Sequence, residues 1–317
     1  MDQERIVLGI SSCLLGEKVR YDGGHKRDPW LVNELGRHVH WVPVCPEVEC
    51  GLPIPREPVR LVGKPEAPRL IAPKSGTDHT ARMQAWIPGR LRQLEAAGLC
   101  GYVFQRSSPS SGMTRIKVYD HNGVPAKVGV GIWARAFMRH FPLLPVEDDG
   151  RLHDPALRDN FITRIFVLRR WREMERAGRS RASLVDFHAR HKLLLMAHSQ
   201  RHLRQMGQLV AHAKELPMAK LYQRYLELLM PALALKASVS KNLNVLQHAA
   251  GYFKRQLDEG DKRELHAILG RYQARQVPLI VPITMLAHYA RKYEQPYLSQ
   301  QVYFDPHPLE LKLRNYI

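Results

Sequence analysis

Cysteine and long apolar runs are both scarce in this chain. Its 317 residues include 4 cysteines, too few for the disulfide framework of a secreted domain, and this favours a reducing compartment. No apolar run approaches the roughly 20 residues that a membrane-spanning helix needs. Residues 1–5 lead into a short apolar segment and lack the features of a signal peptide. We therefore expect a cytoplasmic protein with no membrane partner.

Acidic residues are also underrepresented. The chain has 30 Asp and Glu against 48 Lys and Arg, a net charge of +18, while its 44% hydrophobic and 25% charged residues are ordinary for a globular protein. Such an excess indicates a polyanionic partner, most simply a nucleic acid, with an anionic membrane as the weaker alternative. No feature of the sequence indicates a protein partner.

Residues 1–150 predict an α/β, Rossmann-like domain. Short apolar runs typical of strands alternate with segments that carry helix start and stop signals. The expected strands cover residues 6–10, 40–44, 99–104 and 116–119, and the expected helices cover 29–35, 77–97 and 131–140.

The pattern changes after residue 150. Residues 151–180 predict a basic connecting helix, and residues 181–317 predict an all-α domain because only helical periodicity occurs there. This last segment holds 20 Lys and Arg against 10 Asp and Glu. Its expected helices cover 183–213, 218–229, 241–259, 261–275 and 278–293.

Three of the expected strands end in loops of small residues. Cys13 follows the first strand, Cys45 follows the second, and a serine-rich loop over 107–112 follows the third. Because ligands bind beyond the carboxyl ends of strands in open α/β sheets, these loops are expected to surround one point. Soft thiolates at such a point suit iron, iron–sulfur or zinc chemistry, and the absence of a Cys-x-x-Cys pair disfavours zinc.

Several motifs in this order resemble the TudS-type thiouracil desulfidase family over residues 5–145. The second half resembles the YbgA-like helical domain, at residues 186–198 and 244–254. The two-part arrangement is similar to the RudS-type tRNA 4-thiouridine desulfidases. The motifs of the first half are Ser-Ser-Cys-Leu-Leu-Gly at 11–16, Arg-Tyr-Asp-Gly-Gly at 20–24, Cys-Pro-Glu-Val at 45–48, Gly-Leu-Pro-Ile-Pro-Arg at 51–56 and Ser-Pro-Ser-Ser-Gly at 108–112.

The resemblance implies that a [4Fe-4S] cluster held by three cysteines takes sulfur from 4-thiouridine in tRNA onto its open iron, without net redox change. Cys13 and Cys45 match two ligand positions, but the third holds Ser111 where the family has cysteine. A hydroxyl is a poor substitute for a thiolate in an iron–sulfur site. We therefore expect an absent or incomplete cluster and weak or no activity, with tRNA binding retained. Cys50 and Cys100 match no ligand position.

Other residues of these motifs are candidates for proton transfer and substrate binding. Glu47, two residues after Cys45, is expected to act as general acid or base, with Ser108 as a second polar group near the substrate. Glu47 could instead be a helix-start carboxylate or a partner of Arg56, and Ser108 a turn residue. The expected substrate-binding residues, which could also serve only to order the first loop, are Ser12, Arg20 and Tyr21.

The helical half carries a candidate tRNA-binding stripe of Arg190, Lys192, Arg201 and Arg204, since basic residues neutralise phosphates; the alternative is a solvated face. Histidines at helical spacing beside it are less suited to metal, because no acidic or cysteine ligand accompanies them; they are His188, His191, His198 and His202. Two further functions stay open: a non-catalytic RNA-binding protein that has lost its cluster, and a desulfidase of free thiouracil.

Overall fold

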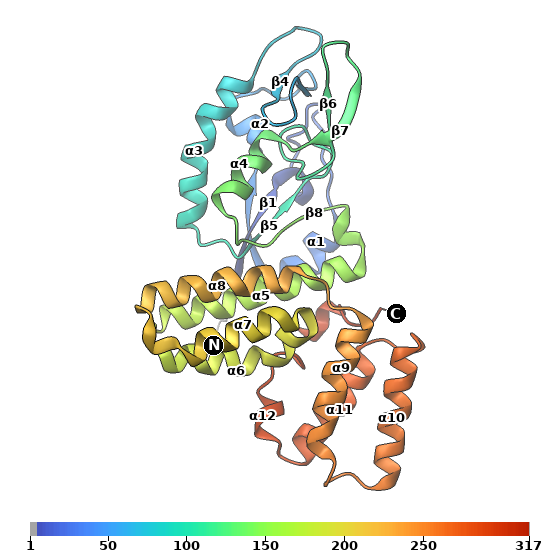
Figure 1. The fold of residues 1–317 in the computed structure, drawn as a ribbon. Coiled ribbons are helices and arrows are strands. Elements are labelled where there is room, and N and C mark those ends of the chain that lie inside the picture. The colour runs from blue at the N-terminus through green and yellow to red at the C-terminus, as the bar shows by residue number, and fades with distance from the viewer. Residues whose placement is uncertain (1–4, 317) are drawn as a thin grey trace. The chain divides into compact units, whose positions relative to one another are not determined.

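The computed structural model describes residues 5–316. The chain forms two compact units, Met1–Asp154 and Pro155–Ile317. The first contains sheets and helices and the second is all helical, which confirms the predicted fold class (Figure 1). The helix expected as a connector is α5 (Pro155–Arg176), and it belongs to the second unit.

The main sheet of the first unit is parallel throughout. Its strands are β1 (Ile6–Ser11), β2 (Val39–Val44), β5 (Gly101–Phe104) and β8 (Val146–Asp148), in the order β2-β1-β5-β8. In the sheet, β2 lies on one side of β1, and the later strands β5 and β8 lie on the other side. This reversal creates a switch point at the carboxyl ends of β1 and β5, where ligands bind in such sheets.

Aromatic packing fixes α3 (Thr80–Ala96) and α4 (Ile132–His140) against this sheet. The ring of Tyr102 on β5 lies 4.5 Å from that of Phe137, and Trp86 on α3 lies 5.0 Å from Trp133 on α4. Gly9 on β1 leaves room for this cluster, since a Cβ there would lie 2.2 Å from the Tyr102 ring. The short helices α1 (Pro29–Asn33) and α2 (Pro46–Glu49) precede and follow β2.

A second sheet occupies the same unit, and the sequence predicted only one of its strands. It consists of β3 (Arg60–Val62), β4 (Arg69–Ile71), β6 (Ile116–Tyr119) and β7 (Pro125–Gly129), in the order β4-β3-β6-β7. The strands β3 and β4 have three residues each, and four of the five residues of β7 are exposed. Such strands give too little periodicity to be recognised.

The second unit packs its helices around buried aromatic rings; Trp171 stacks on Tyr225 at 5.3 Å. The predicted helix over 183–213 is wrong as a single element, because Ser199 has extended backbone and its Oγ caps a new helix by accepting from the His202 N–H. Within residues 5–316, no helix is long and apolar enough to cross a membrane. The other helices are α6 (Arg181–His198), α7 (Gln200–Ala211), α8 (Met218–Ala234), α9 (Val239–Ala250), α10 (Glu259–Gln273), α11 (Ile280–Lys292) and α12 (Pro296–Ser299).

Candidate functional site

A pocket of about 260 Å³ opens at the carboxyl edge of the parallel sheet. It receives residues from the short 3₁₀ helix after β1 (Ser12–Leu15), from the start of α2 and from the loop after β5. The sequence-predicted residues of the first unit all line this pocket: Ser12, Cys13, Arg20, Tyr21, Cys45, Glu47, Ser108 and Ser111. Their roles stay predictions, but their common location follows from the strand order.

The serine loop is fixed by its own hydrogen bonds and by the start of α4. The Ser108 Oγ accepts from the N–H groups of Ser110 and Ser111, at 3.3 and 3.0 Å, as the turn-residue alternative expected. The Ala134 N–H donates to the Ser110 carbonyl at 3.2 Å, and the Gly131 N–H donates to Gly112 at 2.8 Å. The loop therefore has a defined conformation at the pocket wall.

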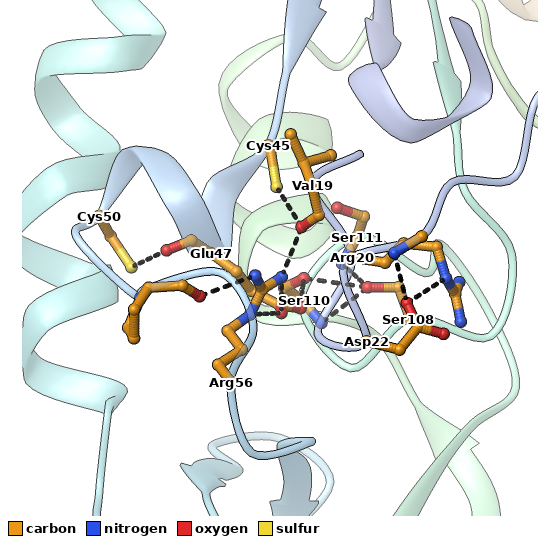
Figure 2. A network of polar contacts seen from close by, with 12 residues as sticks. Val19, Arg20, Asp22, Cys45, Glu47, Cys50, Arg56, Ser108, Ser110 and Ser111 are labelled. Carbon is orange, nitrogen blue, oxygen red and sulfur yellow. Dashed lines mark hydrogen bonds and ion pairs between the residues drawn. The ribbon is translucent and has the colours of Figure 1, made fainter. Parts of the chain in front are cut away.

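Glu47 is held on both of its carboxylate oxygens. The Arg56 guanidinium donates to Oε2 from Nε and Nη2, at 2.9 and 2.7 Å, and the Ser110 Oγ donates to Oε1 at 2.7 Å. The side chains of Glu47 and Arg56 are 12% and 6% exposed, so this ion pair is largely shielded from water. The Ser108 hydroxyl lies 2.9 Å from the Ser110 Oγ, and Figure 2 shows the resulting chain of contacts.

The thiols of Cys13 and Cys45 face the same pocket and are both protonated at neutral pH. Burial raises the pKa of Cys13 to about 12, with the nearby Cys45 as a smaller cause, and burial also raises the pKa of Cys45. The Cys45 Sγ contacts the Val19 carbonyl at 3.9 Å. Because a metal ligand must lose its proton, any metal bound here would displace two protons.

The donors present do not fit the three-thiolate cluster site that the family resemblance implies. Ser111 is 4% exposed, lines the pocket and supplies a hydroxyl where a third thiolate is required. Cys50 does not replace it, since its Sγ lies 3.3 Å from the Glu47 carbonyl (Figure 2) and Cys50 is not among the residues that line the pocket. Across residues 5–316, no three His, Cys, Asp or Glu side chains are placed to hold a metal ion.

The candidate tRNA-binding residues of the second unit lie on two helices. Arg190 and Lys192 belong to α6 and are exposed, as are Arg201 and Arg204 on α7. Arg190 forms an ion pair with Asp186 at 2.9 Å, so part of its charge is neutralised.

The neighbouring histidines each contact a protein group. Nδ1 of His191 lies 2.7 Å from the Phe187 carbonyl, and Nδ1 of His198 lies 2.6 Å from the Leu235 carbonyl. His188 contacts the Tyr225 hydroxyl at 3.1 Å, and His202 contacts the Ser199 hydroxyl at 2.8 Å. Burial lowers the pKa of His191 to about 3 and that of His198 to about 4. These contacts are those of core and capping residues.

Two features of the pocket were missed from the sequence. The first is Ser110 as the donor to Glu47, for which the serine-rich loop gave the only signal. The second is a group of further lining residues that the sequence analysis did not single out, among them Val19, Lys26 and Gln105.

Fold and site together define a two-domain protein, with a cysteine-bearing pocket on an α/β unit and a separate helical unit. Residues 8–149 match the family described as 2-thiouracil desulfurase, and residues 192–308 match the family described as protein of unknown function (DUF1722). The chain thus joins a 2-thiouracil desulfurase domain to a DUF1722 (YbgA-like) domain, and it belongs through its helical half to the family of YbgA.

Two individual proteins are similar to parts of this chain. The uncharacterized protein YbgA of Escherichia coli (strain K12) is 32% identical over 158 residues, which cover 50% of this chain and 94% of YbgA. Among solved structures, the [4Fe-4S]-dependent thiouracil desulfidase TudS is 31% identical and covers 48% of this chain and 95% of its own, with a TM-score of 0.38. The two relatives correspond to different halves of the chain.

Proposed function

We propose that this protein is a tRNA 4-thiouridine desulfidase whose sulfur-removing activity is impaired by Ser111 and whose substrate binding is intact. One observation carries the proposal: Cys13, Cys45 and Ser111 line one pocket together with Glu47, in a domain of the 2-thiouracil desulfurase family. In that family's cofactor, thiolate-held iron supplies a soft Lewis acid for sulfur. Two thiols and one hydroxyl do not make that ligand set.

The residues of this chain supply proton transfer and orientation. Because the Ser110 hydroxyl donates to Glu47, the Ser108 hydroxyl is left to donate to Ser110, and the three groups form a path from the loop to a carboxylate. A proton released in the pocket passes along this path to Glu47, which acts as the general base. Arg56 fixes the orientation of this carboxylate through its two hydrogen bonds to Oε2. Ser12, Arg20 and Tyr21 line the same pocket and orient the thiolated uracil ring of the substrate.

The tRNA part of the proposal rests on charge. A thiolated base stacked in folded RNA has to leave its stack to enter a pocket at a sheet edge. The helical domain, with its excess of basic residues, would bind the tRNA through its phosphate backbone and its overall shape. The α/β pocket would recognise the sulfur atom. Arg190, Lys192, Arg201 and Arg204 are the proposed contacts, and exposure of all four supports this assignment.

The donor set favours one second candidate, a non-catalytic RNA-binding protein. With a hydroxyl at position 111, binding of thiolated tRNA without sulfur release would be the whole function. Desulfidation of free thiouracil is the third candidate, and it needs the pocket but not the basic helices.

The test is sulfur release under anaerobic conditions, with iron and sulfide supplied, by this chain and by its Ser111→Cys variant. Each is assayed on tRNA containing 4-thiouridine and on free thiouracil. We expect slow or no release by the chain with Ser111 and clear release from tRNA by the variant. Release from free thiouracil alone would contradict the tRNA assignment, and release by neither protein would favour the binding candidate.

A further inference from the structure

The solvent-facing side of the second sheet is a basic surface that the proposed function does not use. Alternation along the strands places Leu61 and Val118 in the core, paired across β3 and β6. The neighbouring residues Arg60, Lys117 and Tyr119 therefore lie on the opposite side, since successive side chains of a strand point to opposite faces. Lys127 on β7 pairs directly with Lys117 and shares that face.

Two lysines directly opposite each other on adjacent antiparallel strands repel each other, and such a pair destabilises a sheet. No ion pair within residues 5–316 offsets this repulsion, because neither lysine has a carboxylate partner there, and the same holds for Arg60 and Arg115. An arrangement of this kind becomes favourable when an anion binds between the cations.

Arg60 and Tyr119 add a flat element to this surface. The Arg60 guanidinium lies over the Tyr119 ring at 4.6 Å, and its buried Nε has no hydrogen-bond partner among the described residues. A cation stacked on an aromatic ring beside further basic residues is the combination that nucleic-acid-binding sheets and grooves use to hold backbone and bases.

A groove runs along this face and lies next to the candidate active site. Its cations are Arg60, Arg115, Lys117 and Lys127, and none of its lining residues is acidic. Ser107 and Pro109 line both this groove and the pocket of Cys13 and Cys45. The serine loop therefore separates the two hollows by a single wall within one compact unit.

We propose that this groove binds the sugar-phosphate backbone of the RNA segment next to the nucleotide whose base enters the pocket. The inference rests on the proposed function for the identity of the RNA, and it adds a second RNA contact, on the α/β domain itself. Phosphates of the strand neutralise the Lys117–Lys127 pair, and the contact is independent of base sequence. The phosphate of a single nucleotide has the same chemistry, and the experiment separates the two sources.

The test uses the full chain and unmodified RNA, so that it does not depend on sulfur release. Binding of a labelled tRNA transcript and of a single-stranded RNA is measured by fluorescence anisotropy over a range of salt concentrations. The variant is Lys117→Ala with Lys127→Ala. The matched control, Arg92→Ala with Arg139→Ala, removes two exposed cations from α3 and α4 of the same unit.

For single-stranded RNA, we expect the lysine variant to bind more weakly and to lose about 1.4 from the slope of log K against log salt, because each phosphate contact contributes roughly 0.7. The unfolding temperature should not fall, since both lysines are exposed. A slope equal to that of the control variant would overturn the proposal. So would loss of uridine 5′-monophosphate binding with an unchanged RNA slope, since the groove would then hold a single nucleotide. Absence of sulfur release from thiolated tRNA would bear on the proposed function alone.

Discussion

Gly131 holds the serine loop in place because it has no side chain. A Cβ at this position would lie 2.4 Å from the Ser110 carbonyl oxygen and 3.0 Å from the Gly112 nitrogen, both of them backbone atoms that cannot rotate away. The position of Ser110, and through it the contact with Glu47, therefore depends on a close approach between α4 and the loop.

Gly131→Ala is expected to displace the loop and destabilise the protein by about 1–3 kcal/mol, the usual cost of overpacking. Urea unfolding of the first unit measures this change. The matched control is Gly89→Ala in the interior of α3, where nothing lies within 4 Å of the new Cβ. It should stabilise by about 0.5–1 kcal/mol, because alanine is the better helix former. Equal effects of the two substitutions would contradict the close-approach account.

The common location of three site residues could be predicted, because each of them follows the end of a strand. Cys13, Cys45 and Ser111 follow three strands whose carboxyl ends share one sheet edge, so their meeting at a pocket follows from the strand order. The ion pair of Glu47 with Arg56 was one of the alternatives that the sequence offered, and the structure shows it. The hydrogen bond from Ser110 was not predicted, because it depends on the path of a loop, and loop paths leave no periodic signal in a sequence.

At the scale of elements, the second sheet is the largest difference between expectation and structure. Its strands are short, one face is solvated and charged, and the core face is limited to a few residues such as Leu61, Leu70 and Val118. Most long helices with buried stripes were predicted more closely, but the helix expected over 241–259 ends at Ala250, where a 3₁₀ turn follows. The helix break at Ser199 depends on one side-chain cap within continuous helical periodicity.

The Lys117–Lys127 pair predicts opposite effects on stability and on RNA binding. Lys117→Glu converts a repulsive cross-strand pair into an attractive one, so the first unit should gain about 0.2–1 kcal/mol. RNA affinity should fall, because a carboxylate now faces the groove. Thermal unfolding and anisotropy titration of the same preparation measure both effects. A variant that is more stable and binds RNA unchanged would exclude this face from RNA binding.

His191 on α6 gives the helical unit a dependence on pH. Burial lowers its pKa from 6.5 to about 3 in the folded state, so the unfolded chain binds a proton that the folded chain excludes. Stability is therefore complete above pH 6.5 and decreases as the pH falls from 6.5 towards 3, by about 1.4 kcal/mol for each unit. The stacking of His191 on Phe187 at 3.8 Å allows Phe as a replacement of similar shape.

His191→Phe should therefore flatten the acid side of the stability profile of the helical unit. Denaturant unfolding at pH 7 and pH 5, followed by circular dichroism, gives the difference. His198, whose pKa burial lowers to about 4, should account for the dependence that remains. If the substituted and natural chains lose equal stability between these pH values, the buried histidine is not the cause.

At the scale of the whole molecule, the two units each have a core of their own. The pocket lies in the first unit, and residues 181–317 of the second carry 20 Lys and Arg against 10 Asp and Glu. This division could be predicted because the sequence changes from mixed to purely helical periodicity near residue 150. In the Ser111→Cys background, a chain ending at Asp154 should still act on free thiouracil, since the pocket lies entirely within residues 11–111.

The same shortened chain should lose most of its activity on thiolated tRNA, because the proposed stripe on α6 and α7 is removed. The comparison of rates on the two substrates, with the full-length variant as reference, checks this expectation. Undiminished activity on tRNA would show that the α/β unit holds the RNA without the helices.

We propose that position 111 decides whether this pocket holds an iron–sulfur cluster. The iron and acid-labile sulfide content after anaerobic reconstitution of the chain with Ser111 and of Ser111→Cys, together with their absorption spectra, tests this directly. We expect about four irons and four sulfides per chain in the cysteine variant, and far less with Ser111. Equal loading of both proteins, or iron in neither, would contradict the proposal.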